Sequence, residues 1–122
     1  MNYTGKTSKD QRRNDLLKLI RKEVVKKSNT GFKTILSYPE INRYYLGLKH
    51  ITTSNKTICE ALNIPVEAGT RYKAELEENQ KLVASIDKFQ CPYTSEFVHF
   101  LSTNPLEFER LTKSKINQYK MF

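Results

Sequence analysis

Residues 57 to 76, TICEALNIPVEAGTRYKAEL, constrain the fold most, because two helical patterns meet there across a very short turn. In the first pattern Ile58, Ala61 and Leu62 repeat at i, i+3 and i+4, which predicts a helix with one buried face. Ser54 and Asn55 precede this helix, and either residue is suited to be its N-cap. So short a connection leaves little freedom in the angle between the two helices.

The turn itself has residues suited to end one helix and start another. Asn63 stands where a left-handed residue is expected, and Ile64 is expected to point inward. Pro65 suits the first turn of the next helix, because its missing N–H would have no partner there. Because two helices joined so closely cannot lie parallel, the sequence predicts an angled helix-turn-helix pair with an exposed second helix.

Positive charge is concentrated at one end of the chain. The 122 residues contain 21 Lys or Arg and 13 Asp or Glu, a formal net charge of +8. Residues 1 to 33 hold ten of the basic residues and only three acidic ones, so nearly all of the excess lies there. Such segregation is typical of polyanion binding by counterion release, although a solvated basic helix without a partner has the same composition. The neighbouring helix pair favours nucleic acid.

The sequence has no feature typical of a membrane or secreted protein. It contains no run of about 18 apolar residues, and Met1 is followed by polar residues rather than by the apolar core of a signal peptide. We therefore expect a cytoplasmic protein with no membrane partner, built on one compact domain.

The cysteines and histidines lack the spacing of a metal site. Cys59 and Cys91 form no CxxC pair, and His50 and His99 form no HxxxH pair. Free thiols and structural histidines are expected, with no metal and no cofactor. Because no Gly-rich phosphate loop, HExxH motif or nucleophile elbow occurs, we also expect no catalytic activity.

The basic segment is predicted to form one long amphipathic helix over residues 10 to 27, because it lacks Gly and Pro and its apolar residues recur at helical spacing. These apolar residues are Leu16, Leu17, Ile20 and Val24. The helix is expected to end near Gly31, and a short connection to follow it. Residues 1–36 are interpreted as a basic N-terminal helical extension.

A second helix is predicted after Ser37 and Pro39, which combine an N-cap candidate with a proline suited to the first helical turn. Its apolar side consists of Ile41, Tyr44, Tyr45 and Leu48. Residues 51 to 53 are β-branched and are interpreted as a brief strand before the helix pair.

Beyond the helix pair the period changes to alternation, which predicts a strand with one buried face. Leu82, Ala84 and Ile86 are expected on one face, and Ser85 and Asp87 on the other. A tip at residues 91–95 and a second strand at residues 97–101 complete a predicted β-hairpin.

A last helix is predicted from Pro105 toward Tyr119, because residues 102–105 supply a cap and a first-turn proline. The residues that it has available to bury are Leu106, Leu111 and Ile116. Residues 104–122 are interpreted as this C-terminal helix.

The order helix, helix, turn, helix, hairpin over residues 39 to 103 resembles the winged helix-turn-helix superfamily of bacterial and phage DNA-binding proteins. The best-matching run is ALNIPVEAGTRYKAELEENQKL, which is similar to the superfamily's succession of a small residue, Leu, a turn residue, Ile, a helix start, Arg-Tyr, Leu and an acidic pair. The resemblance implies that residues 37–103 form the winged domain, with residues 65–79 as the recognition helix and residues 82–101 as the wing.

Two residues depart from this pattern. Gly69 stands where such helices normally have a core Val or Ile, and Lys73 replaces a frequent apolar residue. A helical Gly costs up to about 1 kcal/mol relative to Ala. Either the ring of Tyr72 fills the missing volume, which we favour, or the helix packs closely against a partner backbone at Gly69.

Helical spacing separates an inward from an outward face of the predicted recognition helix. The inward residues are Val66, Gly69, Tyr72 and Leu76, and the outward residues are Glu67, Thr70, Arg71, Ala74 and Glu78. Arg71 is suited to bidentate recognition of guanine, and Thr70 to a phosphate or a thymine methyl. A surface ion pair between Glu67 and Arg71 is the alternative.

Acidic residues on this helix are unfavourable near phosphates, so other segments must supply attraction. The predicted DNA-binding residues of the winged domain are Lys56, Glu67, Thr70, Arg71, Lys73, Lys81, Lys88, Gln90 and Tyr93. Those of the N-terminal segment are Arg12, Arg13, Lys18, Arg21 and Lys22. Tyr93, at the hairpin tip, has an alternative role in packing the turn.

We therefore predict a mainly α fold with a small β-hairpin, a winged helix-turn-helix with extra N-terminal and C-terminal helices. The predicted function is sequence-specific binding of double-stranded DNA by a prokaryotic or phage transcriptional regulator. The first and last helices are the expected surfaces of a homodimer. Two alternatives remain open: a protein–protein interaction module built on the same fold, and RNA binding through the basic segment.

Overall fold

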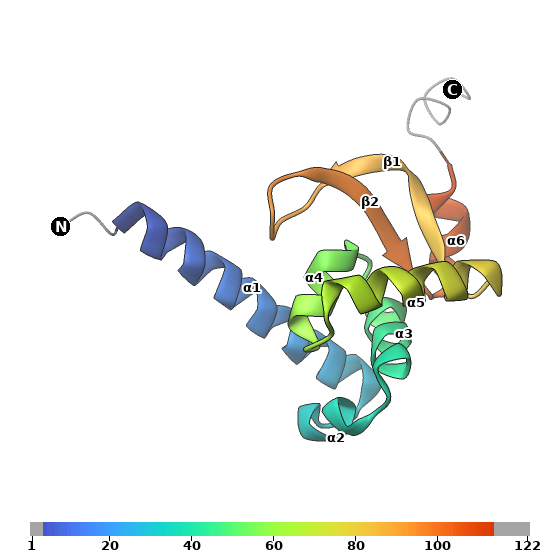
Figure 1. Ribbon diagram of the computed structural model, residues 1–122, viewed down its shortest axis with the longest axis horizontal. Helices are drawn as coiled ribbons and strands as arrows, with labels where there is room; N and C mark the ends of the chain where they lie inside the picture. The colour runs from blue at the N-terminus through green and yellow to red at the C-terminus, as the bar shows by residue number, and fades with distance from the viewer. Residues whose placement is uncertain (1–3, 114–122) are drawn as a thin grey trace.

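The computed structural model describes residues 4–113, with side chains from residue 9 onward. The fold is mainly α-helical with one antiparallel two-stranded hairpin (Figure 1). In chain order the elements are α1 (Thr4–Ser28), α2 (Phe32–Ser37), α3 (Glu40–His50), α4 (Asn55–Ala61), α5 (Val66–Glu78), β1 (Val83–Gln90), β2 (Phe97–Ser102) and α6 (Pro105–Leu111). None of these helices is long and apolar enough to cross a lipid bilayer.

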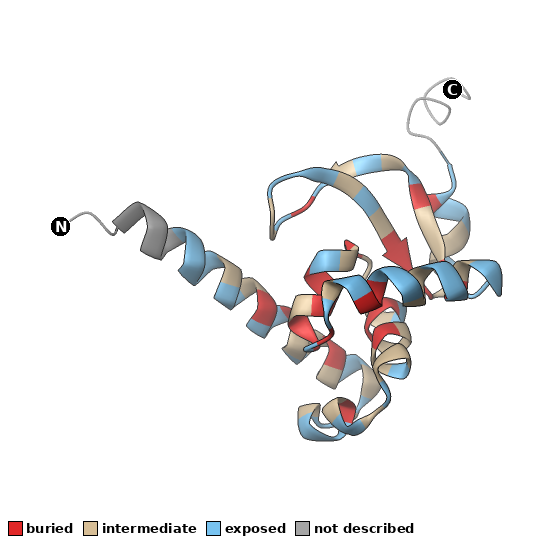
Figure 2. Cartoon of the chain, in the orientation of Figure 1, coloured by how far each residue is buried: buried red, intermediate tan, exposed pale blue. Residues whose placement is uncertain are grey.

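The core lies where α1, α3, α4 and α5 meet, as the buried segments in Figure 2 show. α3 is central, because it packs against the other three helices and its Tyr44 and Leu48 side chains are fully buried. α1 adds Leu17, Ile20 and Val24, which are buried at the predicted helical spacing. Each such aliphatic side chain contributes about 1.5–3 kcal/mol on full burial.

The turn between α4 and α5 has the geometry that its sequence predicts. Ser54 caps α4 with its hydroxyl, and Asn63 ends the helix with a φ of 57°, in the left-handed region. Ile64 is buried with 4% of its surface exposed. Pro65 is the N-cap of α5, so the helix itself starts one residue later, at Val66.

α5 crosses α4 closely because Gly69 has no side chain. A Cβ atom there would overlap Cys59 Sγ and would lie 2.9 Å from Asn55 Oδ1 and 3.3 Å from Tyr44 Cε1. The expectation that Tyr72 fills this volume is therefore wrong, because side chains of α4 and α3 occupy it. The Tyr72 ring lies instead edge-on to the ring of Tyr44, with centroids 6.1 Å apart. The helix does approach its neighbours closely at Gly69, but the alternative of a partner backbone is also wrong, because the nearest atoms belong to side chains of this chain.

Three predicted features near the N-terminus are corrected. α1 starts at Thr4, before residue 10, and the expected connection after it contains α2, whose Ile35 is fully buried. Ser37 does not cap α3, because it is the last residue of α2, and α3 follows Pro39 without a side-chain cap. A helix as short as α2 has too few turns to show a helical period in the sequence.

The hairpin forms as predicted, but its register shifts. Between Ala84 and Lys88, β1 advances four residues while β2 advances only two, from Leu101 to His99. This irregularity places two extra residues in β1, which bends the strand. At the base of the hairpin Thr53 and Leu101 exchange backbone hydrogen bonds of 3.3 and 2.8 Å, so the brief strand expected at residues 51–53 is a single bridge.

The register shift reverses the alternation predicted for β1. Ser85 is buried, with 3% of its surface exposed, whereas Ile86 is 54% exposed, so both residues lie on the opposite face from the one expected. The Ser85 hydroxyl accepts a hydrogen bond from the Phe100 amide (2.9 Å) and donates one to the Asp87 carbonyl (2.6 Å). These two bonds satisfy backbone groups that the irregular ladder would leave unpaired.

α6 follows a cap formed by Asn104, whose side-chain oxygen accepts a hydrogen bond from the Leu106 amide at 3.0 Å. Leu111 is buried as predicted, but Leu106 is 88% exposed, contrary to the expectation that it adds to the core. The helix ends at Leu111 rather than near Tyr119. Ile116 and Tyr119 lie outside the described residues.

Gly69→Ala should destabilise the fold by about 1–3 kcal/mol, because the added methyl must displace Cys59 or separate two packed helices. Urea unfolding followed by circular dichroism measures the change. Gly31→Ala is the matched control, because a Cβ at Gly31 meets nothing within 4 Å. Its effect should stay under about 0.5 kcal/mol. Equal unfolding midpoints for the two variants would contradict the close crossing.

Candidate nucleic-acid interface

The outward side of α5 is the first candidate surface. Glu67, Thr70, Arg71, Ala74 and Glu78 are all exposed, as the helical spacing predicts. Within residues 9–113 no ion pair joins Glu67 to Arg71. The Thr70 hydroxyl donates to the backbone carbonyl four residues earlier at 3.2 Å. Arg71 therefore presents an exposed guanidinium near the middle of the helix.

Acidic side chains are concentrated toward the end of α5. Glu75 and Glu78 are exposed, while Glu77 forms a 2.9 Å ion pair with Lys73 Nζ. Lys73, a predicted contact residue, is thus half-buried and paired on its own helix. Because negative charge repels phosphate, the N-terminal half of α5, where Arg71 offsets the one exposed carboxylate, Glu67, is the part that can approach a nucleic-acid backbone.

A groove of about 360 Å³ runs between the start of α4 and the hairpin. Lys56 and Lys73 line it from the two helices, and Thr94, Glu96 and His99 line it from the hairpin side. Lys56 is exposed at the start of α4. The groove therefore brings predicted contact residues of both helices beside the hairpin.

The hairpin carries two further predicted contact residues, Lys88 and Gln90, and both are exposed. Gln90 Nε2 donates to the Ser95 carbonyl at 3.2 Å across the tip. His99, the partner of Lys88 in the register, has its Nδ1 atom 2.7 Å from the Ser85 carbonyl. These contacts fix the side chains of one hairpin face.

Tyr93 attaches the hairpin tip to α1. The Arg13 guanidinium carbon lies 5.2 Å from the centre of the Tyr93 ring, and Arg13 Nε donates to the Tyr93 carbonyl at 2.9 Å. A cation–π contact combined with a hydrogen bond restrains both residues. The geometry favours the packing role that the sequence left open for Tyr93, and it gives Arg13 a structural role as well.

Two arginines hold the end of α4. Arg21 Nε donates to the Ala61 carbonyl at 2.7 Å, and Arg43 Nη1 donates to the carbonyls of Leu62 at 2.8 Å and Asn63 at 3.2 Å. Helix C-termini leave four carbonyls without partners, and these guanidinium groups supply donors for them. Sequence reasoning missed Arg43, because this contact spans 19 residues and leaves no local pattern.

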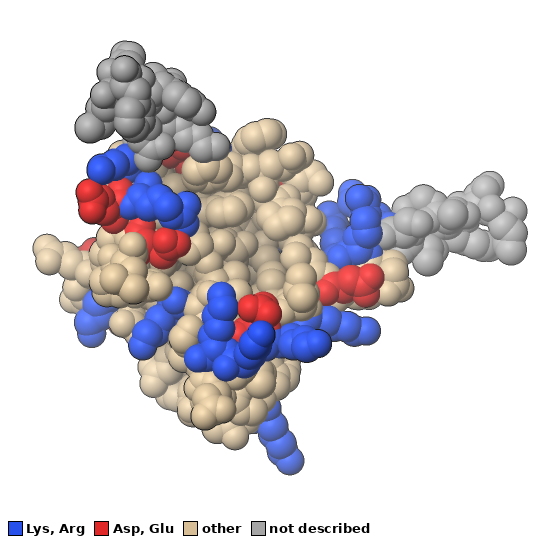
Figure 3. Space-filling view, turned by 180° about the vertical axis from the view of Figure 1, so that it is seen from behind, with Lys and Arg blue, Asp and Glu red and all other residues tan. Residues whose placement is uncertain are grey.

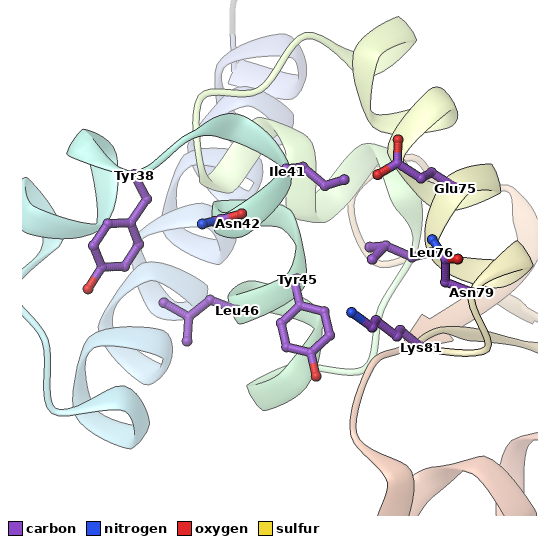
Figure 4. A pocket seen from close by; sticks show the side chains of 9 residues that line it. All are labelled: Tyr38, Ile41, Asn42, Tyr45, Leu46, Glu75, Leu76, Asn79 and Lys81. Carbon is purple, nitrogen blue, oxygen red and sulfur yellow. The ribbon is translucent and has the colours of Figure 1, made fainter.

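Lys81 lies in a different groove, of about 500 Å³, between α3 and the end of α5 (Figure 4). Ile41, Tyr45 and Leu76 line this groove together with Lys81. The structure therefore does not bring Lys81 together with Lys56, although the sequence placed both in one interface.

The remaining predicted cations, Arg12, Lys18 and Lys22, are exposed on α1. α1 packs against α3 and α4, which in turn pack against α5. Seen from behind, Lys and Arg side chains gather along α1 (Figure 3), whereas α5 lies at the front of Figure 1. The basic N-terminal segment and the outward face of α5 are thus different surfaces of the molecule.

The two free, buried cysteines have different surroundings. Burial raises the pKa of Cys59 to about 12. Burial acts in the same direction on Cys91, but hydrogen bonds with the hydroxyls of Ser54 (3.1 Å) and Thr57 (3.2 Å) outweigh it and lower the pKa to about 7. The hydroxyls stabilise the Cys91 thiolate at the start of α4.

No protein-family model, curated protein or solved structure matches the chain. Among the side chains that the structure describes, no group of three or more His, Cys, Asp or Glu is arranged to hold a metal ion. Charge and geometry are therefore the grounds for assigning a function to these surfaces.

Arg21→Ala should lower the free energy of unfolding by about 1–2 kcal/mol, because the Ala61 carbonyl loses a charged hydrogen-bond donor. Lys22→Ala removes the same charge from an exposed neighbour and should change stability by less than about 0.5 kcal/mol. Urea titrations of both variants make the comparison. A loss no larger for Arg21→Ala than for Lys22→Ala would rule out the capping role.

The free energy of unfolding should rise as the pH increases from about 7 to about 9. The folded state holds the Cys91 proton less tightly than the unfolded state, whose thiol has a pKa of 9.0, so raising the pH favours folding. Cys91→Ser should remove this rise, and Cys59→Ser should retain it, because the raised pKa of Cys59 acts only at higher pH. A wild-type profile without the rise would count against the Cys91 thiolate.

Proposed function

We propose that this chain is a sequence-specific double-stranded DNA-binding protein of the winged helix-turn-helix type, acting in transcriptional regulation. In this proposal α3, α4 and α5 form the helical unit, α5 is the recognition helix, and the β1–β2 hairpin is the wing. The order of these elements supports the proposal, as does the bridge between Thr53 and Leu101, which joins the segment before α4 to the hairpin.

The exposed N-terminal half of α5 is the observation that carries the proposal. The tight turn and the crossing at Gly69 hold this helix at a fixed angle against α4, while Thr70 and Arg71 point outward. A helix presented in this way fits the major groove of B-DNA, which is about 12 Å wide. Arg71 would donate to guanine, and Thr70 would contact a phosphate or a thymine methyl.

Backbone phosphates would be held on either side of α5. Lys56 lines the groove at the start of α4, and Lys88 and Gln90 are exposed on the hairpin. Each cation that neutralises a phosphate releases counterions and adds salt-dependent affinity. With the duplex over the first turns of α5, Glu75 and Glu78 lie at the far end of the helix, away from the closest phosphates.

A homodimer would double the length of DNA that is read. Of the two helices predicted to pair, α6 has the stronger support, because its Leu106 is 88% exposed. The outer face of α1 is basic and would repel a second copy of itself. A monomeric mass by light scattering at high protein concentration would remove this part of the proposal.

A second candidate function is that of a protein-interaction module. It is favoured by the exposed Glu75 and Glu78 at the end of α5, which repel phosphate but would attract a basic partner. Binding of a basic protein partner would support this candidate over DNA recognition if duplex DNA does not compete with it and if the Glu75→Gln/Glu78→Gln variant loses it.

Arg71→Ala should reduce the preference for a selected duplex over a scrambled one by about 1–3 kcal/mol, because one bidentate base contact is lost. Lys56→Ala should weaken binding to both duplexes equally. It should also reduce the slope of log affinity against log salt concentration by about 1. Fluorescence anisotropy with duplexes selected from a random pool measures both effects.

Arg110→Ala is the control for this experiment, because it removes the same side chain from an exposed position on α6. It should leave the preference between duplexes unchanged. Equal preference in the Arg71→Ala and Arg110→Ala variants would overturn the assignment of α5 as the recognition helix.

A further inference from the structure

We infer that the outer face of α1 is a second nucleic-acid site, so that one molecule holds two duplex segments at once. The inference rests on the proposed binding of a first duplex by α5. It gives α1 a bridging function, in place of the additional affinity for a single duplex that the sequence suggests.

The site consists of a stripe of lysines, Lys18, Lys22 and Lys26, spaced four residues apart on α1. All three are exposed, and none forms a hydrogen bond or ion pair with another residue in the range 9–113. Helical geometry puts them on the side of α1 opposite its buried residues, Leu17, Ile20 and Val24. At 1.5 Å per residue the stripe spans about 12 Å, over which duplex DNA carries about seven phosphate charges.

Two residues modify the charge of the stripe toward the N-terminus. Arg12 is exposed on α1 six residues before Lys18, which places it about 120° around the helix from that lysine. Asp15 lies between Arg12 and Lys18 and accepts a hydrogen bond from Gln11 Nε2 at 2.9 Å. The stripe thus remains strongly cationic, while the exposed part of α5 has more carboxylates than cations.

The stripe is separate from the α5 surface. α3 and α4 lie between α1 and α5, and the Lys and Arg side chains along α1 are seen from behind the molecule (Figure 3). A single duplex would have to bend around the helical layer to reach both surfaces. Bending a duplex around this layer costs elastic energy, which two separate, unbent duplexes avoid.

Nucleic acid suits this face better than an anionic membrane. A helix that lies in a membrane interface needs an exposed apolar side, but the apolar side of α1 is buried in the core. Leu19, 57% exposed, is the large hydrophobic residue that α1 does present. Phosphate groups can pair with the lysine stripe, and this pairing needs no apolar phase.

A capture assay tests the inference. A biotinylated duplex containing the sequence selected for α5 is fixed on beads, and a fluorescent duplex of unrelated sequence is added with the full chain. The wild-type protein should retain the fluorescent duplex on the beads. Lys18→Glu/Lys22→Glu should reduce this retention by about tenfold or more, because the reversed charges repel phosphate.

The matched control is Lys33→Glu/Lys113→Glu, which makes the same change in net charge at exposed positions on α2 and beyond α6. It should retain the second duplex as the wild type does. Circular dichroism and the one-to-one affinity for the selected duplex should be unchanged in the α1 variant, which separates loss of bridging from loss of folding.

The outcomes separate the inference from the proposed function. If the wild type binds the selected duplex but retains no second one, bridging is overturned and the role of α5 stands. If both charge variants retain the second duplex equally, a dimer with two α5 helices accounts for capture and the α1 site is overturned. If the α1 variant loses all DNA binding while the Arg71→Ala variant binds DNA as the wild type does, the role of α5 is overturned. Binding to phosphatidylserine vesicles in place of duplex DNA also overturns the α1 assignment.

Discussion

The close crossing of α4 and α5 at Gly69 is the constraint on which the rest of the structure depends. It lets the Cys59 and Tyr44 side chains fill the space beneath α5, and the Tyr44 hydroxyl donates to Asn55 Oδ1 at 2.7 Å. Burial raises the pKa of Tyr44 far above its ordinary value, so this hydroxyl remains a donor. The inner face of α5 is fixed by these contacts, and its polar outer face is consequently presented to solvent in one orientation.

Local features of the fold were predictable because each depends on neighbouring residues. The Ser54 cap, the left-handed Asn63 and the change of period that marks the hairpin are of this kind. The features that sequence reasoning missed depend on distant contacts or on very short segments. The bulge at Ser85 needs the opposite strand, and α2 spans only six residues, too few for a period.

The same distinction applies to the candidate site. A 3.6-residue period was enough to assign the exposed face of α5, including Arg71. It could not show that Arg13 and Arg21 are bound to carbonyls 80 and 40 residues away, or that Arg43 shares this role. Composition located the positive charge in the first 33 residues, but only the packing of α1 against α3 and α4 places that charge on a different surface from α5.

The contact between Arg13 and Tyr93 has a mechanical consequence. The hairpin is held at its base by the Thr53–Leu101 bridge and at its tip by α1. Both of its ends are therefore fixed to the helical part of the molecule. A displacement of the N-terminal half of α1 would therefore also move the hairpin tip, because Arg13 holds Tyr93.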